Sequence, residues 1–134
     1  MQNIMSFSYE IAPNGKQPAL RFGFIIPKDS ILDNISYYAI KSPTLILHIG
    51  SDGGVPPAVL GDPDGGGVSP NGYVSYSFVL TPITGAPAGS QIAFTAITNI
   101  GLIGTNKLDI YFESPDGTNI PSSAAGNLTL QLRS

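Results

Sequence analysis

Apolar and polar residues alternate one by one through several segments of this chain, and this period of two is the feature that most limits its fold. Successive side chains of a strand point to opposite faces, so the alternation indicates strands with one buried face. It runs through residues 5–11, 20–26, 108–112 and 128–132. Denser apolar segments predict strands covered on both faces at 44–49 and 73–80, and a further strand is expected at 91–98.

Residues 31–40 fit two interpretations. Asp29 or Ser30 could cap a helix there, because apolar residues follow at helical spacing. Tyr37, Tyr38 and the β-branched isoleucines are residue types that favour strands instead. We therefore expect a strand in this segment, with a helix as the alternative.

Turn sequences separate these segments. Proline followed by Asn or Asp and then Gly occurs at 13–15, 70–72 and 115–117. Proline presets the first turn residue, and glycine tolerates the positive φ that a chain reversal requires. With 16 Gly and 12 Pro among 134 residues, long helices have no room. The sequence thus predicts an all-β fold, an antiparallel and jelly-roll-like β-sandwich of about seven to eight strands, in a single domain over residues 1–134.

Charge is scarce in this chain. Lys, Arg, Asp and Glu make up 11 % of the residues, against about 25 % in globular domains, and the net charge is −3. Without a basic excess that would neutralise phosphates, no direct nucleic-acid partner is expected. No apolar run reaches the roughly 18 residues of a membrane helix, so no membrane insertion is expected. Uncharged polar groups or a partner protein must then cover the surface, which predicts a homo-oligomer or attachment to a larger assembly.

A long segment without strand alternation covers residues 50–72, with eight of the glycines, four of the prolines and no Lys or Arg. Loops of this length are usually functional, so we expect a binding or assembly loop. Its candidate residues are Asp52, Asp62 and Asp64, with Tyr73 and Tyr76 beside them. Asp62 and Asp64 are also the candidate ligands of calcium, the one cofactor considered, because calcium takes oxygen ligands from flexible segments. Ordinary solvated turns are the favoured alternative, since Asp and Gly commonly mark them.

Catalytic signatures are missing from the sequence. His48 is the only histidine, there is no cysteine, and no nucleophile motif is present. The carboxylate pairs Asp62–Asp64 and Glu113–Asp116 lie in turn sequences, which are poorly suited to the fixed separation that glycoside hydrolysis needs. We therefore expect no enzymatic activity.

Tyrosines support an alternative function. A tyrosine ring can stack on a sugar or on another subunit, because it combines an apolar body with a polar tip. The candidates are Tyr37, Tyr38, Tyr73, Tyr76 and Tyr111. The alternative is a carbohydrate-binding, lectin-like module that binds a glycan with or without calcium. Residues 47–50 and 112–118 are also similar in order to segments of calcium-dependent galactose-binding bacterial lectins, whose calcium ligands are not matched at 113–114 or 121–122.

Three segments follow one another in an order that resembles a known group of proteins. They are IPKDSILDNI at 26–35, SPTLILHIG at 42–50 and NKLDIYF at 106–112. Their order is similar to that in small β-sandwich virion proteins of tailed phages, of the head-decoration, head-fibre and minor structural kind. The resemblance covers roughly residues 24–112, and it implies a packing scaffold with no catalytic residues to carry over. It implies a structural protein of a virion that self-associates or docks on a larger shell.

The first residues bear on location. Residues 1–7 lack the basic region and the long apolar region of a signal peptide, so export by cleavage is not expected. The resemblance to virion proteins makes the virion the expected location, with the cytoplasm or non-classical export as alternatives.

Overall fold

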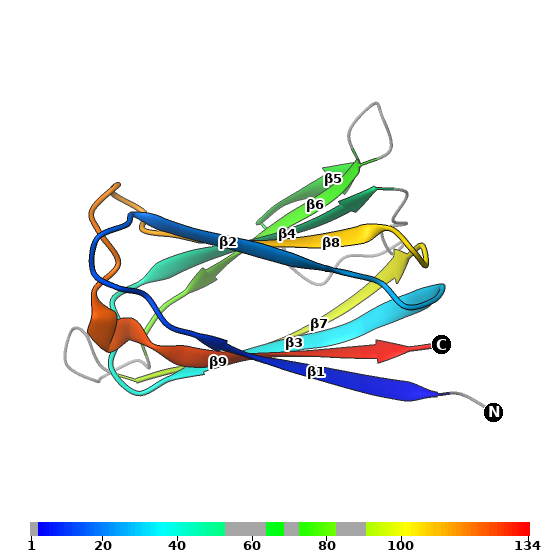
Figure 1. Cartoon of the computed structure of the whole chain (residues 1–134), viewed down its shortest axis with the longest axis horizontal. Helices are drawn as coiled ribbons and strands as arrows, with labels where there is room; N and C mark the ends of the chain where they lie inside the picture. Colours follow the sequence, from blue (N-terminus) through cyan, green and yellow to red (C-terminus); the bar gives the residue numbers. More distant parts are fainter. Residues whose placement is uncertain (1–2, 53–63, 69–72, 83–90) are drawn as a thin grey trace.

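The computed structural model describes residues 3–52, 64–68, 73–82 and 91–134, and strands form almost all of its regular structure (Figure 1). The strands are β1 (Ile4–Ile11), β2 (Ala19–Ile25), β3 (Ser30–Ala39), β4 (Leu45–Asp52), β5 (Asp64–Val68), β6 (Tyr73–Leu80), β7 (Ile92–Leu102), β8 (Lys107–Glu113) and β9 (Gly126–Arg133). A three-residue 3-10 helix, η1 (Ser122–Ala124), is the one helix among these residues. Within the described part, therefore, no helix has the length or apolarity to cross a membrane.

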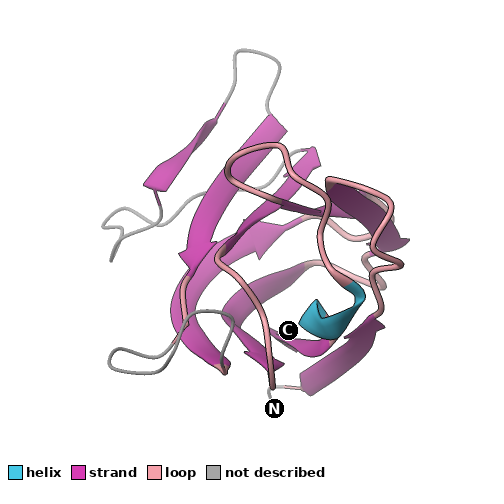
Figure 2. Cartoon of the chain, turned by 90° about the vertical axis from the view of Figure 1, so that its left-hand side faces the viewer, coloured by secondary structure: helices cyan, strands magenta, loops and turns pink. Residues whose placement is uncertain are grey.

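The strands form two antiparallel sheets, seen as two layers in Figure 1 and curving around a shared interior in Figure 2. Sheet A has the order β1-β9-β3-β7, and sheet B has the order β2-β8-β4-β6-β5. Each connection crosses from one sheet to the other, except those that join β4 to β5 and β5 to β6. Without β5, the remaining strands have the two four-stranded sheets of a jelly roll. The predicted jelly-roll-like antiparallel sandwich is confirmed.

The segment 50–72 differs from the loop that its composition predicts. Residues 50–52 continue β4, and β5 adds an edge strand to sheet B by pairing with β6. The expectation that the whole segment lacks strand structure was therefore wrong. Glycine weakens a strand and hides its side-chain alternation, but its backbone can still pair in a sheet. Residues 53–63 and 69–72 lie outside the described part of the chain.

Burial along the strands follows the predicted alternation, and the inward side chains of both sheets form one core. At its centre the Tyr37 ring of sheet A packs against the Phe112 ring of sheet B, with centroids 5.1 Å apart. β4 does not fit the prediction of burial on both faces, since Leu47 is buried but Ile46 and His48 are partly exposed. In β6, likewise, Val79 is exposed. The outer face of sheet B therefore faces solvent in the described structure, as one face of an antiparallel sheet commonly does.

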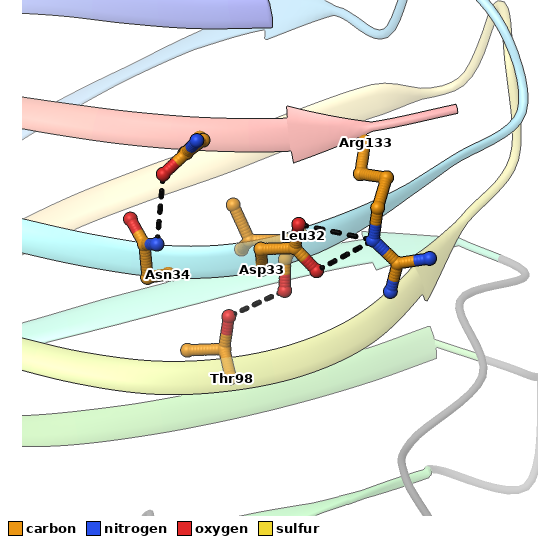
Figure 3. A network of polar contacts seen from close by, with 6 residues as sticks. Leu32, Asp33, Asn34, Thr98 and Arg133 are labelled. Atoms are coloured by element: carbon orange, nitrogen blue, oxygen red, sulfur yellow. Dashed lines mark hydrogen bonds and ion pairs between the residues drawn. The ribbon is translucent and has the colours of Figure 1, made fainter. Parts of the chain in front are cut away.

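Residues 31–40 form a strand and not a helix, because β3 pairs with β7 on one side and with β9 on the other. The pairing shifts register between Leu32 and Asn34 on both sides. Polar side chains stabilise this bulge (Figure 3). The Thr98 hydroxyl donates a hydrogen bond to the Leu32 carbonyl, and the Asn34 amide donates to Gln131 Oε1 at 2.8 Å.

Two of the predicted turn sequences lie in the described part, and both have the expected backbone. Gly15 has a φ of 79° and Gly117 a φ of 78°, the left-handed region that glycine enters without steric cost. In the first turn, Asn14 Oδ1 also accepts a hydrogen bond from the Lys16 amide at 2.8 Å. The third sequence, at 70–72, lies outside the described residues.

Candidate functional site

A hollow of about 620 Å³ lies on the outer face of sheet B. Its floor is formed by residues 49–50 and Ser75. The side chains around it are Arg21, His48, Lys107, Asp109, Tyr111 and Glu113. The hollow thus gathers four of the chain's fifteen charged residues and its only histidine.

One row of cross-strand neighbours forms the aromatic row of the hollow. Arg21 of β2 pairs with Tyr111 of β8, Tyr111 pairs with His48 of β4, and His48 pairs with Ser77 of β6. The Arg21 guanidinium carbon lies 4.8 Å from the Tyr111 ring centroid, and the His48 and Tyr111 rings are 5.4 Å apart. His48 Nε2 lies 3.6 Å from a carboxylate oxygen of Glu113. Each side chain of this row that carries a ring or a charge therefore contacts a neighbour, which limits its freedom.

A second row of cross-strand neighbours, two residues along each strand from the aromatic row, forms the glycine row. Gly23 pairs with Asp109, Asp109 pairs with Gly50, and Gly50 pairs with Ser75. Gly50 has no side chain beside the larger side chains of the aromatic row, and it lines the hollow. A Cβ at Gly23 would lie 2.6 Å from Lys107 Cε, so the missing side chain also lets Lys107 extend over the strand. Lys107 Nζ reaches Asp109 at 3.2 Å.

A different kind of surface lies at the edge of sheet A. No described strand pairs with the outer side of β7, which is the longest of the described strands. Its eleven residues include no charged residue and no proline. Residues 92–97 pair with β3 without a register shift, so no bulge interrupts this half of the edge. At its end, Ile97 is 80 % exposed.

The other edge of sheet A, formed by β1, is also weakly protected against pairing, whereas the β2 edge of sheet B is better protected. β1 carries one charged residue, Glu10, and exposes Ile4 at one end. β2 is shorter, carries Arg21 and lies between Pro18 and Pro27. Natural proteins protect exposed edges with charge, proline, short strands and bulges. β2 has several of these protections, whereas residues 92–97 of β7 have none of them.

The residues predicted from segment 50–72 lie in different environments. Asp52 is exposed at the end of β4 and pairs with Tyr73, the first residue of β6. Asp64 begins β5 and pairs with Ser77, in line with the aromatic row. The side chains of Asp64 and Tyr73, and the whole of Asp62, lie outside the described part.

Tyr76, the fifth of these residues, lies in the core. It is 1 % exposed, so its ring does not contribute to a surface. Its place in the sequence contains a signal for this, because Tyr76 is in phase with the buried Phe78 and Leu80. The prediction of Tyr76 as a contact residue relied on its residue type and did not consider its position in the strand alternation.

Metal binding at Asp62 and Asp64 remains a prediction, since those side chains are not described. Among the residues that are described, no three His, Asp or Glu side chains come together as a metal site. Asp116, a member of the other carboxylate pair, stabilises its own turn. Hydrogen bonds from the Thr118 hydroxyl, the Ser114 hydroxyl and the Thr118 amide lower the pKa of Asp116 to about 2.

Sequence reasoning did not assign the hollow, although one signal pointed to it. Asp109, Tyr111 and Glu113 alternate with the apolar residues of β8, and that phase places all three on the outer face. The sequence contains no equivalent signal for their neighbours. Arg21 and His48 join them only through the pairing of β2, β8 and β4.

Comparison with known proteins adds similarity of fold alone. No protein-family model matches the chain, and a search of curated proteins finds no match either. Similar solved structures include Desmodium yellow mottle tymovirus, with 10 % identity, 99 % of this chain and 87 % of that chain covered, and a TM-score of 0.36. Tomato aspermy virus has 10 % identity, coverage of 97 % and 76 %, and a TM-score of 0.44.

A third similar structure is that of Bacillus endospore appendages, which are described as disulfide-linked pili. It has 13 % identity, coverage of 99 % and 85 %, and a TM-score of 0.34. With TM-scores below 0.5, these similarities carry no argument about function. Function must be argued from the surfaces of this chain.

Proposed function

We propose that this chain is a non-catalytic structural protein that assembles with copies of itself through the edge of sheet A, as a capsid decoration or appendage component of a virion. The observation that supports this most directly is the uncharged outer edge of β7. The partner at this edge is a second copy of the chain. Docking of the resulting assembly on a larger shell is part of the same proposal.

The chemistry of an unprotected edge favours this partner. Every second residue of an edge strand directs its backbone N–H and C=O away from the sheet, and a second strand can pair with these groups without any change of fold. The exposed side chains of β7, including Thr95 and Ile97, offer an uncharged surface beside that edge. Burying Ile97 against another copy would add hydrophobic stabilisation, because 80 % of its surface is now exposed.

The virion is proposed on two grounds. The segments at 26–35, 42–50 and 106–112 resemble those of tailed-phage virion proteins, and the jelly roll is a fold that capsid proteins use. The low charge of the chain agrees with a surface that packs against other protein. Immunogold labelling of purified phage particles with an antibody against the chain would test the location, and unlabelled particles would count against it.

The oligomeric state tests the assembly. Light scattering coupled to size exclusion should give a mass above that of one 14.0 kDa chain, rising with concentration. A specific interface should bury about 1,000 Å² or more. The variant Ile97→Lys places a charge beside the edge and should shift the mass toward the monomer.

Ile40→Lys is the matched control. Ile40 is 76 % exposed, close to the 80 % of Ile97, but it follows β3 and lies outside the β7 edge. Its variant should assemble as the wild type does. A wild-type chain that remains monomeric at every concentration would overturn the proposal, as would an Ile97→Lys chain with wild-type mass.

A further inference from the structure

The hollow on the outer face of sheet B has the donor and acceptor pattern of a binding site for an uncharged, hydroxyl-rich molecule. We propose that it binds a neutral saccharide, with Arg21, Tyr111, His48, Asp109 and Glu113 as the contacting side chains. This site is separate from the sheet A edge, because it lies on the other sheet. It therefore does not depend on how copies of the chain assemble.

The balance of charge selects the ligand class. Arg21 and Lys107 are cations, and Asp109 and Glu113 are anions, so the four formal charges of the hollow sum to zero. A charged ligand would gain attraction from one pair and repulsion from the other. A saccharide hydroxyl is both donor and acceptor, so it can donate to the carboxylates and accept from the cations.

The volume of the hollow agrees with a small saccharide. Its volume of about 620 Å³ lies within the roughly 300–1,000 Å³ of small-molecule sites. Gly50 lines the hollow without a side chain of its own, and its backbone is buried. The aromatic row supplies the Tyr111 and His48 rings and their polar atoms to the lining.

The side chains are held in place before a ligand arrives. Arg21 lies on the Tyr111 ring at 4.8 Å, and His48 contacts both Tyr111 and Glu113. Lys107 reaches Asp109 at 3.2 Å. Because these groups extend from paired strands rather than loops, no backbone segment has to be ordered on binding.

A panel of immobilised neutral and sulfated oligosaccharides, probed with the labelled full chain, tests the proposal. We expect binding to at least one neutral saccharide, and isothermal titration with that saccharide then gives the affinity. Asp109→Asn and Glu113→Gln preserve side-chain shape and should each weaken binding by about tenfold or more, since each removes a charged hydrogen-bond acceptor. If one of these two variants does not fold, the other still tests the proposal.

Tyr111→Ala and Tyr38→Ala form the matched control pair. Tyr38 is 46 % exposed on β3 of sheet A, away from the hollow, so its variant should bind as the wild type does. Tyr111→Ala should lose binding because it removes the ring between Arg21 and His48. Binding to none of the neutral saccharides would overturn the proposal. So would binding to sulfated saccharides alone, or equal affinity in wild type, Asp109→Asn and Tyr111→Ala.

The Ile97→Lys chain separates this proposal from the assembly proposal. Whether this variant is monomeric or assembled, each chain should bind the saccharide with the affinity of the wild type. A monomeric wild type that binds saccharide would refute only the assembly, and an assembling wild type that binds none would refute only the saccharide site.

Discussion

Arg133 Nε lies 3.1 Å from each carboxylate oxygen of Asp33, across the bulge where β3 pairs with β9 (Figure 3). Both side chains are more than two-thirds buried, so solvent screens this ion pair less than one at a fully exposed site. The pair fixes the position of the bulged residue relative to the last strand of the chain.

Arg133→Gln should therefore lower the free energy of unfolding by about 1 kcal/mol, a value between those of exposed and buried ion pairs. Urea denaturation measures it. A double-mutant cycle with Asp33→Asn should show coupling between the two sites, and strictly additive effects would mean that the pair contributes nothing.

Tyr76→Phe should leave stability unchanged or raise it by up to about 1 kcal/mol, because the buried Tyr76 hydroxyl has no hydrogen-bond partner among the described residues. Tyr37→Phe is the control, since the Tyr37 hydroxyl donates to the Ala124 carbonyl at 3.3 Å. It should lose about 1 kcal/mol. Thermal and urea denaturation of both variants measure these changes. A Tyr76→Phe chain that loses more stability than the Tyr37→Phe chain would contradict the prediction.

Alkaline pH should destabilise the fold through Tyr37. Burial raises the pKa of Tyr37 from 10.0 to about 12. Above pH 10 the Tyr37 hydroxyl loses its proton in the unfolded chain and keeps it in the folded chain. The contribution of protonated Tyr37 to the free energy of unfolding is therefore fully present below pH 10 and is lost between pH 10 and 12. The slope from this group is about 1.4 kcal/mol per pH unit. Urea denaturation across this pH range should give a shallower decline for Tyr37→Phe, and equal slopes would contradict the shift.

Gly126→Ala should destabilise the fold more than Gly117→Ala. A Cβ at Gly126 would lie 2.5 Å from the Tyr38 carbonyl oxygen and 2.7 Å from the Tyr37 hydroxyl, so the sheet would have to move. A Cβ at Gly117 meets nothing within 4 Å, and only its φ of 78° opposes the change. We expect about 3 kcal/mol or more at Gly126 and about 1 kcal/mol at Gly117. Equal losses in urea denaturation would show that the close contacts at Gly126 relax.

Alternation and turn chemistry predicted most of the strands, because both are local properties of the chain. The turns at Gly15 and Gly117 have the expected positive φ, and β3 is a strand as its tyrosines indicated. β5 was missed because three of its five residues are glycine, which leaves no alternation to detect.

The hollow could be predicted only in part. The phase of Asp109, Tyr111 and Glu113 places them outward, but nothing in a single sequence says that Arg21 and His48 lie on either side of Tyr111. Strand order fixes that, and the pairs join residues far apart in the chain. The floor of the hollow likewise depends on the pairing that places Gly50 beside Asp109.

The aromatic row draws its members from β2, β8, β4 and β6, so the proposed binding surface exists only while sheet B is intact. A bound saccharide would then be coupled to the cooperative unfolding of that sheet. At a free concentration of 100 times Kd it would add about 2.7 kcal/mol to the folded state. Occupancy of the hollow would report the integrity of a whole sheet rather than the order of one loop.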